Sequence, residues 1–399
     1  MKILHIEDMF FPDAGYQLNL LAKYQKQQGH QVIIITAVLD EIKGCVNSFF
    51  GTEGLEDRDA QYRQTADVPI IRVKPRWKRL LSGRVIFNYK RLMQIVQQVE
   101  PDVVFVHGND TFTGIQFTIH QKKKRIPLVL DSHMLDMASK NPFQKLFKWF
   151  YRHWITPILV KQKIPVIRTQ DDDYVQKRLG IPLSQCPWIS VGSDTMLFHP
   201  DEQVRAQFRQ ENGIAENDFV VVYTGKLDES KGGKLLAKAF LEPFETEKNV
   251  VLLVVGNTSG EYGQEVEELF QQSKNRIIRF PTQKYMDLAP FYQAADLSVF
   301  PKQCSLSFYD AQACGLPVVS EDNNINVERC SHENGLNFKA GDVEDFRKQM
   351  LEVIQLTEEE YSRMSKNAFE FVAKNYDYAR ISEEYTKILE QEVNRWKKK

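Results

Sequence analysis

The chain alternates short apolar runs with amphipathic helical patterns, and it does so twice along its length. The first series of apolar runs comprises residues 2–6, 31–36, 70–73, 103–107, 128–131, 166–168 and 188–189. The second comprises residues 219–225, 250–256, 276–280, 297–301 and 317–320. Such runs are typical of strands buried on both faces, and the helical patterns between them predict parallel connections. The sequence therefore predicts an α/β fold with two Rossmann-like, doubly wound sheets.

The length of 399 residues exceeds what one hydrophobic core usually organises, so two domains are expected. Gly and Pro punctuate residues 191–200, between the last strand of the first series and a polar helix predicted at 201–212. We place the boundary there, with an N-terminal domain at 1–194 and a C-terminal domain at 195–376. Residues 377–399 predict one long amphipathic helix, which is either a solvated tail or a strap that packs back on the first domain.

The composition excludes several classes of protein. Hydrophobic residues make up 42% and charged residues 26%, and 52 Lys and Arg balance 53 Asp and Glu, so no net charge would attract nucleic acid. The cysteines stand singly at Cys45, Cys186, Cys304, Cys314 and Cys330. This scatter predicts reduced thiols in the cytoplasm rather than disulfides or a zinc site. Residues 1–8 do not resemble a signal peptide, and no apolar run approaches the roughly 18–20 residues of a transmembrane helix.

Two windows of the first domain, residues 68–99 and 137–170, contain no acidic residue. The second window interleaves aromatic side chains with cations. These are Phe143, Phe147, Trp149, Phe150, Tyr151 and Trp154, with Lys140, Lys145, Lys148, Arg152, Lys161 and Lys163. Aromatic residues that enter a bilayer interface beside cations that meet anionic headgroups make residues 140–163 a candidate for peripheral attachment to a membrane's inner face. A core helix with a solvated basic face explains the same pattern, and both readings stay open.

The stretch from Phe300 to Val319 predicts a strand, a turn of small residues, a helix and a second strand. Ser305 and Ser307 lie where a helix beginning near Phe308 would direct its free N–H groups, and Asp310 lies in the first turn of that helix. A helix N-terminus of this kind can bind an anion, and the carboxylate can accept hydroxyl groups of a ligand. A serine-capped surface helix packed on a sheet is the alternative explanation.

Two lysines lie in another turn, which follows the first strand of the second series. Lys226 and Lys231, five residues apart and flanked by glycines, precede a helix predicted at 234–240. Two cations in such a turn can converge on a diphosphate and stabilise a departing nucleotide. The alternative is a pair of solvated loop lysines. The Walker pattern is missing, so a P-loop nucleoside triphosphatase is not expected.

The order of these features resembles that of the retaining glycosyltransferases of family 4, whose GT-B fold has two Rossmann-like domains facing a cleft. The matching segments of the second domain are Gly225-Lys226, Lys231-Gly232, 252–256, Ala295-Asp296 and 310–319. The resemblance implies that Gly225, Lys226 and Lys231 lie at a donor diphosphate. It also implies that Pro281 and Thr282 lead to the nucleobase pocket.

The same family carries two glutamates separated by seven residues, and this chain differs at both positions. The resemblance implies that Asp310 binds ribose hydroxyls in place of the second glutamate, while Lys302 replaces the first. Ser305, Leu306 and Ser307 then form a variant of the phosphate-facing turn. Because the first glutamate usually contacts the donor sugar, Lys302 predicts an unusual donor or reduced activity.

The first domain also carries matches to this family. Residues 12–15 fit its glycine-rich loop, which implies that Gly15 lies near the donor, although Tyr16 replaces a second glycine and restricts the approach. His133 ends a strand where the family places a histidine that contacts the donor sugar, at an edge where open α/β sheets bind ligands. A lone histidine is more often structural. His30 follows Gly29 and is expected to close a helix.

The resemblance implies an enzyme that transfers a sugar, with retention of configuration, in cell-surface polysaccharide synthesis. The donor would be a uridine or guanosine diphosphate sugar, and the acceptor a glycan or a lipid-linked molecule. Lys226, Lys231 and His133 are the predicted catalytic residues. No cofactor and no metal are expected, because no His, Asp or Glu cluster has ligand spacing. The alternatives are a sugar-nucleotide epimerase of the same fold, and a catalytically silent partner that binds a glycan or another transferase.

Overall fold

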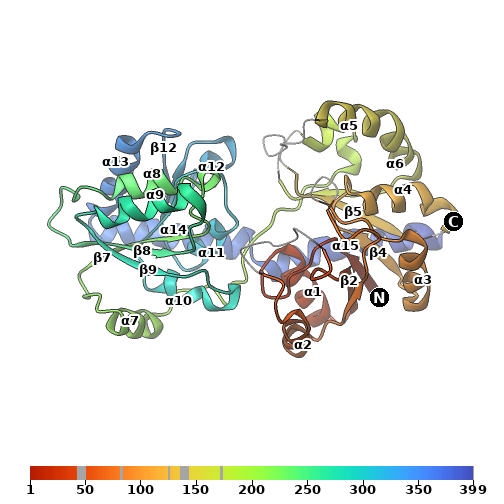
Figure 1. Cartoon of the computed structure of the whole chain (residues 1–399), viewed down its shortest axis with the longest axis horizontal. Coiled ribbons are helices and arrows are strands. Elements are labelled where there is room, and N and C mark those ends of the chain that lie inside the picture. Colours follow the sequence, from red (N-terminus) through yellow and green to blue (C-terminus); the bar gives the residue numbers. More distant parts are fainter. Residues whose placement is uncertain (43–50, 81–83, 125, 135–142, 171–173, 399) are drawn as a thin grey trace. The chain divides into compact units, whose positions relative to one another are not determined.

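The computed structural model describes residues 1–42, 51–80, 84–124, 126–134, 143–170 and 174–398. The chain forms two compact units, of which the first consists of Met1–Val191 together with Tyr378–Lys399 and the second of Gly192–Asp377 (Figure 1). The chain therefore passes between the units twice. Cys45 and Lys140 lie outside the described residues.

The first unit contains a six-stranded parallel sheet in the order β3-β2-β1-β4-β5-β6. The strands are β1 (Lys2–Ile6), β2 (Gln31–Ala37), β3 (Ile70–Val73), β4 (Val103–Val106), β5 (Leu128–Ser132) and β6 (Val166–Arg168). The α-helices are α1 (Gln17–Gln27), α2 (Leu55–Ala66), α3 (Tyr89–Val99), α4 (Phe112–Lys124), α5 (Gln144–Phe150), α6 (Thr156–Gln162) and α15 (Tyr378–Lys397). A π-helical turn, Tyr151–Ile155, joins α5 to α6.

The second unit repeats this topology with the order β12-β11-β10-β7-β8-β9, again parallel throughout. Its strands are β7 (Phe219–Thr224), β8 (Val250–Val255), β9 (Arg276–Phe280), β10 (Leu297–Phe300), β11 (Val318–Glu321) and β12 (Gly335–Phe338). Its α-helices are α7 (Glu202–Glu211), α8 (Gly233–Ala239), α9 (Gly260–Gln271), α10 (Ala289–Gln293), α11 (Ser307–Ala313), α12 (Asn324–Arg329), α13 (Val343–Ile354) and α14 (Glu358–Asn375).

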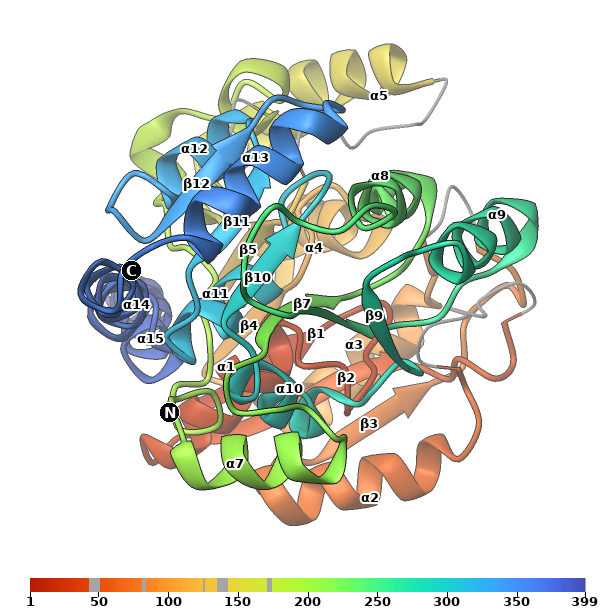
Figure 2. The same cartoon turned by 90° about the vertical axis from the view of Figure 1, so that its left-hand side faces the viewer.

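Burial explains why the strands are so apolar. All residues of β4, β7 and β8 are buried, because helices cover both faces of each sheet. Around the second sheet, α8, α9 and α13 lie on one face, while α7 and α10 lie on the other (Figures 1 and 2). The predicted α/β fold with two Rossmann-like sheets is confirmed. The run at 188–189, predicted as a strand, forms only a single bridge between Trp188 and Arg168.

Each sheet has one place where the strand order reverses. These places lie between β1 and β4 in the first unit and between β7 and β10 in the second. Loops leaving the carboxyl ends of the two strands diverge there, which makes the point a preferred ligand site in open α/β sheets. The residues that follow β1, β4, β7 and β10 are therefore the first candidates for a ligand site.

The C-terminal helix α15 packs within the first unit, where it contacts α1, β4 and β5. Tyr385 and Leu389 are fully buried in this contact, and the Tyr385 hydroxyl donates a hydrogen bond of 3.3 Å to the Ile189 carbonyl oxygen. The segment is thus part of the core of this unit. No helix in the described part of the chain combines the length and apolar character needed to cross a membrane.

We predict that Leu389→Ala will lower the free energy of unfolding by about 2–4 kcal/mol, because it leaves a cavity under α15. Chemical denaturation followed by circular dichroism measures this change. Glu383→Ala, on the exposed face of the same helix, is the matched control and should stay within about 0.5 kcal/mol of wild type. Equal effects of the two substitutions would show that α15 does not pack as described.

Candidate functional site

The loops at the carboxyl end of the second sheet form a connected rim. Leu227, after β7, donates its N–H to the Asn257 carbonyl oxygen after β8 at 3.4 Å. The Asn257 side chain in turn accepts the N–H of Thr282, after β9, at 3.2 Å. A Cβ on Gly256 would lie only 1.9 Å from the Gly225 carbonyl oxygen, so a glycine is required where these loops approach. Gly225 and Thr282, both predicted from the sequence, therefore lie on one rim, and Pro281 precedes Thr282 as an exposed residue.

The loop after β10 joins the same rim through Lys231. The Lys231 ammonium group donates a hydrogen bond of 3.2 Å to the Cys304 carbonyl oxygen. Burial is the main cause of its lowered pKa, and the positive charges of Lys226 and Arg329 act in the same direction. The two lysines predicted from the sequence thus lie close enough to interact, next to the turn that carries Ser305.

Asp228 gives this turn its shape. Its carboxylate accepts the N–H of Lys231 at 3.0 Å and caps the short 3₁₀ turn Glu229–Lys231, after which Gly232 adopts a φ of 75°. A Cβ on Gly232 would lie 3.1 Å from the Cβ atoms of Pro301 and Lys302. The exposed Lys302 therefore lies against the lysine turn, where it adds a positive charge. The sequence alone did not show that these two segments touch.

Arg329 is a residue of this rim that sequence reasoning missed. Its side chain is almost completely buried, lies over the rings of Phe308 and Tyr309, and donates to the Ser305 carbonyl oxygen at 2.9 Å. It thereby fixes the 302–307 turn and places a third cation close to Lys231. Its position near the end of α12, with no neighbouring motif, gave no signal in the sequence.

The helix after this turn starts differently from the expectation. Leu306, not a serine, occupies the N-cap of α11, and the helix begins at Ser307. The Ser307 side chain forms a hydrogen bond with Tyr292, while Ser305 offers its carbonyl oxygen to Arg329. The Ser307 side chain therefore bonds to Tyr292 and does not occupy the N-cap position.

Asp310 lies deeper than the resemblance implied. It is 4% exposed, and one carboxylate oxygen accepts hydrogen bonds from the Ser193 hydroxyl at 2.7 Å and the Tyr285 hydroxyl at 3.3 Å. Burial raises its pKa to about 7, although both hydrogen bonds oppose the shift. A role on ribose remains a prediction.

The Ala295-Asp296 motif has a structural role in this unit. Asp296 pairs with Arg205 at 2.6 Å and with Arg209 at 2.7 Å, and it also accepts the Val220 N–H at 2.7 Å. These contacts attach helix α7 to the start of β7 and β10. The motif therefore supports the sheet from the edge opposite the rim.

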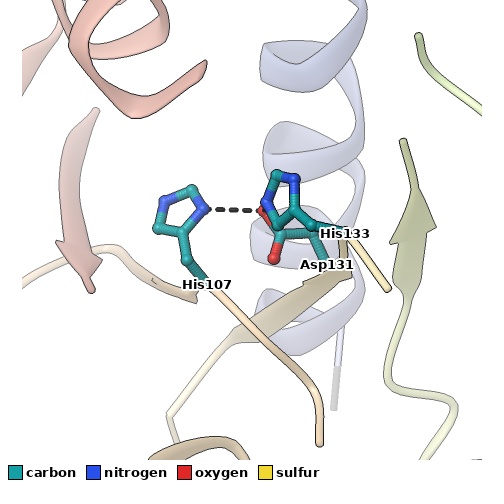
Figure 3. Close-up of side chains that lie close together, drawn as sticks. All are labelled: His107, Asp131 and His133. Atoms are coloured by element: carbon teal, nitrogen blue, oxygen red, sulfur yellow. Dashed lines mark hydrogen bonds and ion pairs between the residues drawn. The ribbon is translucent and has the colours of Figure 1, made fainter. Parts of the chain in front are cut away.

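A second cluster lies at the carboxyl end of the first sheet. His107 follows β4, Asp131 is the second-to-last residue of β5, and His133 comes directly after that strand. Their possible metal-ligand atoms lie within 4.8 Å of one another (Figure 3). Asp131 is fully buried, whereas the His133 side chain is 42% exposed. Among the described residues these three could hold a metal ion. The sequence showed no such cluster because its members come from two strands 24 residues apart.

Electrostatics bind this cluster together. Burial alone would raise the pKa of Asp131, but the interactions with His133 and His107 lower it overall. Burial opposes protonation of His133, yet the Asp131 carboxylate raises its pKa. His133 is thus not a lone histidine, because it shares a carboxylate with His107.

Two carboxyl groups follow β1 at the same edge, and sequence reasoning did not single them out. Burial raises the pKa of Asp8 to about 7, helped by the neighbouring Glu7, whose own pKa burial also raises. The Thr113 hydroxyl donates to Asp8 at 3.0 Å. Their position at the point of strand reversal was the signal available in the sequence. Gly15 lies further along the same loop with a φ of 65°, before the half-exposed Tyr16.

Comparisons with known proteins agree with both units. Residues 14–185 match the family model Glycosyltransferase Family 4, and residues 204–371 match the model Glycosyl transferases group 1. The probable sucrose-phosphate synthase of Thermosipho melanesiensis is 23% identical, covering 96% of this chain and 92% of that protein.

Two solved structures share the fold. One is Anabaena Alr3699/HepE in complex with UDP and glucose, with a TM-score of 0.72, 18% identity and coverage of 98% of this chain and 100% of that one. The other is WaaG, a glycosyltransferase involved in lipopolysaccharide biosynthesis, with a TM-score of 0.64, 16% identity and coverage of 97% and 99%.

We predict that the stability of Asp310→Asn relative to wild type will increase as the pH rises from about 4 to about 7. The folded pKa of about 7 lies above the value of 3.8 for a free carboxyl, so the folded state binds more protons in this range. Wild type therefore loses stability from this group as the pH rises, and the amide variant does not. Denaturant titrations at several pH values measure the difference; an offset that does not change with pH would contradict the assignment. Asp287→Asn, at an exposed position, is the control.

Proposed function

Because the chain belongs to the group 1 and family 4 glycosyltransferases, we propose that it transfers a sugar from a nucleoside diphosphate sugar to a glycan or lipid-linked acceptor. The observation that carries this proposal is the convergence of Lys226, Lys231 and Arg329 at the strand-order reversal of the second sheet. Three cations there suit a ligand with several negative charges. A diphosphate that gains charge as it leaves the sugar is such a ligand.

In the proposed reaction the bond between the anomeric carbon and the diphosphate oxygen breaks, and an acceptor hydroxyl forms the new bond. Lys231 is held by the Cys304 carbonyl oxygen, so its ammonium group needs little reorganisation as negative charge develops on the leaving oxygen. Pro281 and Thr282 border the nucleobase. The acceptor proton leaves on the departing phosphate or in solvent, and the anomeric configuration is retained. The donor is a uridine or guanosine diphosphate sugar.

The exposed Lys302 supports an unusual donor. It lies against Gly232, beside the lysine turn, with its side chain in solvent. A cation at this point favours a donor sugar or acceptor that carries negative charge. Lys302, together with Tyr16, which is 46% exposed in the loop after β1, also motivates a second candidate. This candidate is a silent partner that binds a donor without turnover.

Incubation of the protein with uridine and guanosine diphosphate sugars, with and without a membrane extract as acceptor, tests the proposed activity. Release of nucleoside diphosphate that depends on the extract supports transfer, and the anomeric signals of the product report retention. Binding without turnover supports the silent partner, and epimerised free sugar supports the epimerase. Each of these two outcomes would replace the transferase proposal.

The region from Phe143 to Trp154 supports attachment to an anionic membrane surface, in keeping with a lipid-linked acceptor and a role in cell-surface polysaccharide synthesis. Helix α5 buries none of its residues. Large apolar side chains are instead exposed at Phe143 (69%), Leu146 (64%), Trp149 (55%), Phe150 (38%) and Trp154 (63%). This part of the sequence contains basic but no acidic residues, so it carries the positive charge that an anionic membrane surface attracts. Phe147 of α5 packs against the core of the first unit, so the helix keeps one apolar contact with the protein while these other side chains are exposed.

We predict that Lys231→Ala will lower kcat/KM for transfer by roughly 10-fold or more, because the variant loses a cation fixed at the leaving group. Initial rates of nucleotide release measure the effect. Lys238→Ala, an exposed lysine of helix α8, is the matched control and should keep wild-type rates. Wild-type rates for Lys231→Ala would remove this lysine from the mechanism.

We expect the protein to pellet with anionic liposomes at low salt and to be released as salt rises, because the contact is partly electrostatic. The double variant Trp149→Ala/Trp154→Ala should pellet several-fold less. Trp188→Ala, which removes a 44% exposed tryptophan elsewhere on the first unit, serves as control. Failure of wild type to pellet at any salt concentration would contradict the membrane contact.

A further inference from the structure

A pocket of about 400 Å³ lies in the first unit, between helices α4 and α6 and the last turn of α15 (Figure 1). Its volume falls within the roughly 300–1,000 Å³ of ordinary small-ligand sites. Gln121, which lines it, lies nine residues after Phe112, the first residue of α4, and thus about 13 Å along the helix axis. The pocket is therefore separate from the cluster of His107, Asp131 and His133, which lies near the start of α4.

Two amide side chains that line this pocket have polar atoms without hydrogen-bond partners. Gln121 is 2% exposed, and neither its Nε2 nor its Oε1 atom has a partner among the described residues. The Oε1 atom of Gln162 is likewise buried and unpartnered in this part of the chain. Folded proteins contain few such atoms, because a buried polar group without a hydrogen bond is unfavourable. Three of them at one pocket indicate donors and acceptors that a ligand can satisfy.

Trp396 adds an aromatic wall whose orientation is fixed. Its Nε1–H donates a hydrogen bond of 2.7 Å to the carboxylate of Glu392, which is 2% exposed and also pairs with Arg395 at 2.5 Å. Because this bond uses the indole N–H, the partly exposed ring contributes apolar surface to the pocket. Pro157 and Ile158 extend that surface from the start of α6. Apolar walls and a few convergent polar groups are typical of small-molecule sites.

The pocket also carries positive charge. Lys122 and Lys161 line it, both are exposed, and no acidic residue lines it. Neither lysine pairs with a carboxylate in the described part of the chain. Lys161 lies in the last turn of α6, where the helix C-terminus favours a cation. The charge of the two ammonium groups thus stays available to a negatively charged group on a ligand.

These features together favour one class of ligand. A purely apolar molecule would leave the amide groups of Gln121 and Gln162 unpaired, and a small inorganic anion would leave the apolar surface of Trp396 uncovered. A sugar ring carries C–H groups on its faces and hydroxyl groups, which both donate and accept hydrogen bonds, around its edge. It therefore matches an indole wall beside unpaired amides, and a carboxylate on the sugar matches the lysines.

We propose that the pocket between α4, α6 and the end of α15 binds an acidic saccharide, namely a hexuronate unit of a glycan. Gln121 and Gln162 form hydrogen bonds with its hydroxyl groups, and Trp396 covers one of its C–H faces. Lys122 and Lys161 attract its carboxylate. None of these residues belongs to the lysine turn of the second unit, so binding here does not depend on the proposed transfer reaction.

Ligand binding by the purified full chain tests the proposal without any measurement of transfer. In saturation-transfer NMR, D-glucuronic acid should bind with a dissociation constant of about 1 mM or below, and D-glucose at least about 5-fold more weakly. An excess of UDP, added as a ligand for the lysine turn, should not displace the glucuronic acid. Absence of glucuronic acid binding, equal binding of glucose, or displacement by UDP would each overturn the proposal.

Gln121→Leu removes the amide atoms with little change in volume and should weaken glucuronic acid binding at least about 5-fold. Because the amide has no partner in the described part of the chain, the variant should also keep or raise Tm. Gln116→Leu, on the same helix but outside the pocket, is the matched control and should bind as wild type does. Wild-type binding by Gln121→Leu, or a Tm lowered by several degrees, would overturn the proposal.

The charge of the ligand is tested separately. Lys122→Ala should reduce the preference for glucuronic acid over glucose, because the variant loses a cation at the pocket. Lys123→Ala, at the exposed neighbouring position that does not line the pocket, should keep the preference of wild type. An equal preference in the two variants would contradict the assignment of an acidic sugar.

Discussion

The hydrogen bond between the Lys231 ammonium group and the Cys304 carbonyl oxygen connects the two loops that diverge from the centre of the second sheet. One loop follows β7 and the other follows β10, and the strand order reverses between them. Gly232 allows this approach, because a side chain there would press on Pro301 and Lys302. The contact holds Lys231 against the loop that carries Lys302 and Ser305.

Positive charges outnumber negative charges around this contact. Lys226, Lys302 and Arg329 lie close to Lys231, whereas Asp228 uses its carboxylate to cap the turn. Such a cluster of like charges is tolerated because most of these side chains reach solvent, and Arg329 is stabilised by two aromatic rings. A polyanionic ligand relieves the remaining repulsion, which is the physical basis for assigning a diphosphate to this place.

Local patterns determined most of the fold, and so they could be predicted. Continuous apolar runs such as residues 219–225 and 250–256 identified buried parallel strands, and the glycine and lysine spacing after the first of them located the lysine turn. Arg329 could not be predicted, because only tertiary packing brings it over Phe308 and Tyr309. The bond from Ser193 to Asp310 spans 117 residues and likewise has no local signal.

The first sheet illustrates the same limit. His133 was predicted as a single residue at a strand end, but its properties depend on Asp131 and His107, and through His107 on a chain of hydrogen bonds that reaches helix α15. These contacts form only when the fold has brought distant residues together.

The most direct test of the central claim is calorimetric titration of the protein with UDP and GDP and with the nucleosides uridine and guanosine. If the lysine turn holds a diphosphate, one nucleoside diphosphate will bind with micromolar affinity and its nucleoside at least about 100-fold more weakly, since the charge contacts supply much of the binding energy. Equal affinity for nucleoside and nucleoside diphosphate, or no binding of either diphosphate, would contradict the claim.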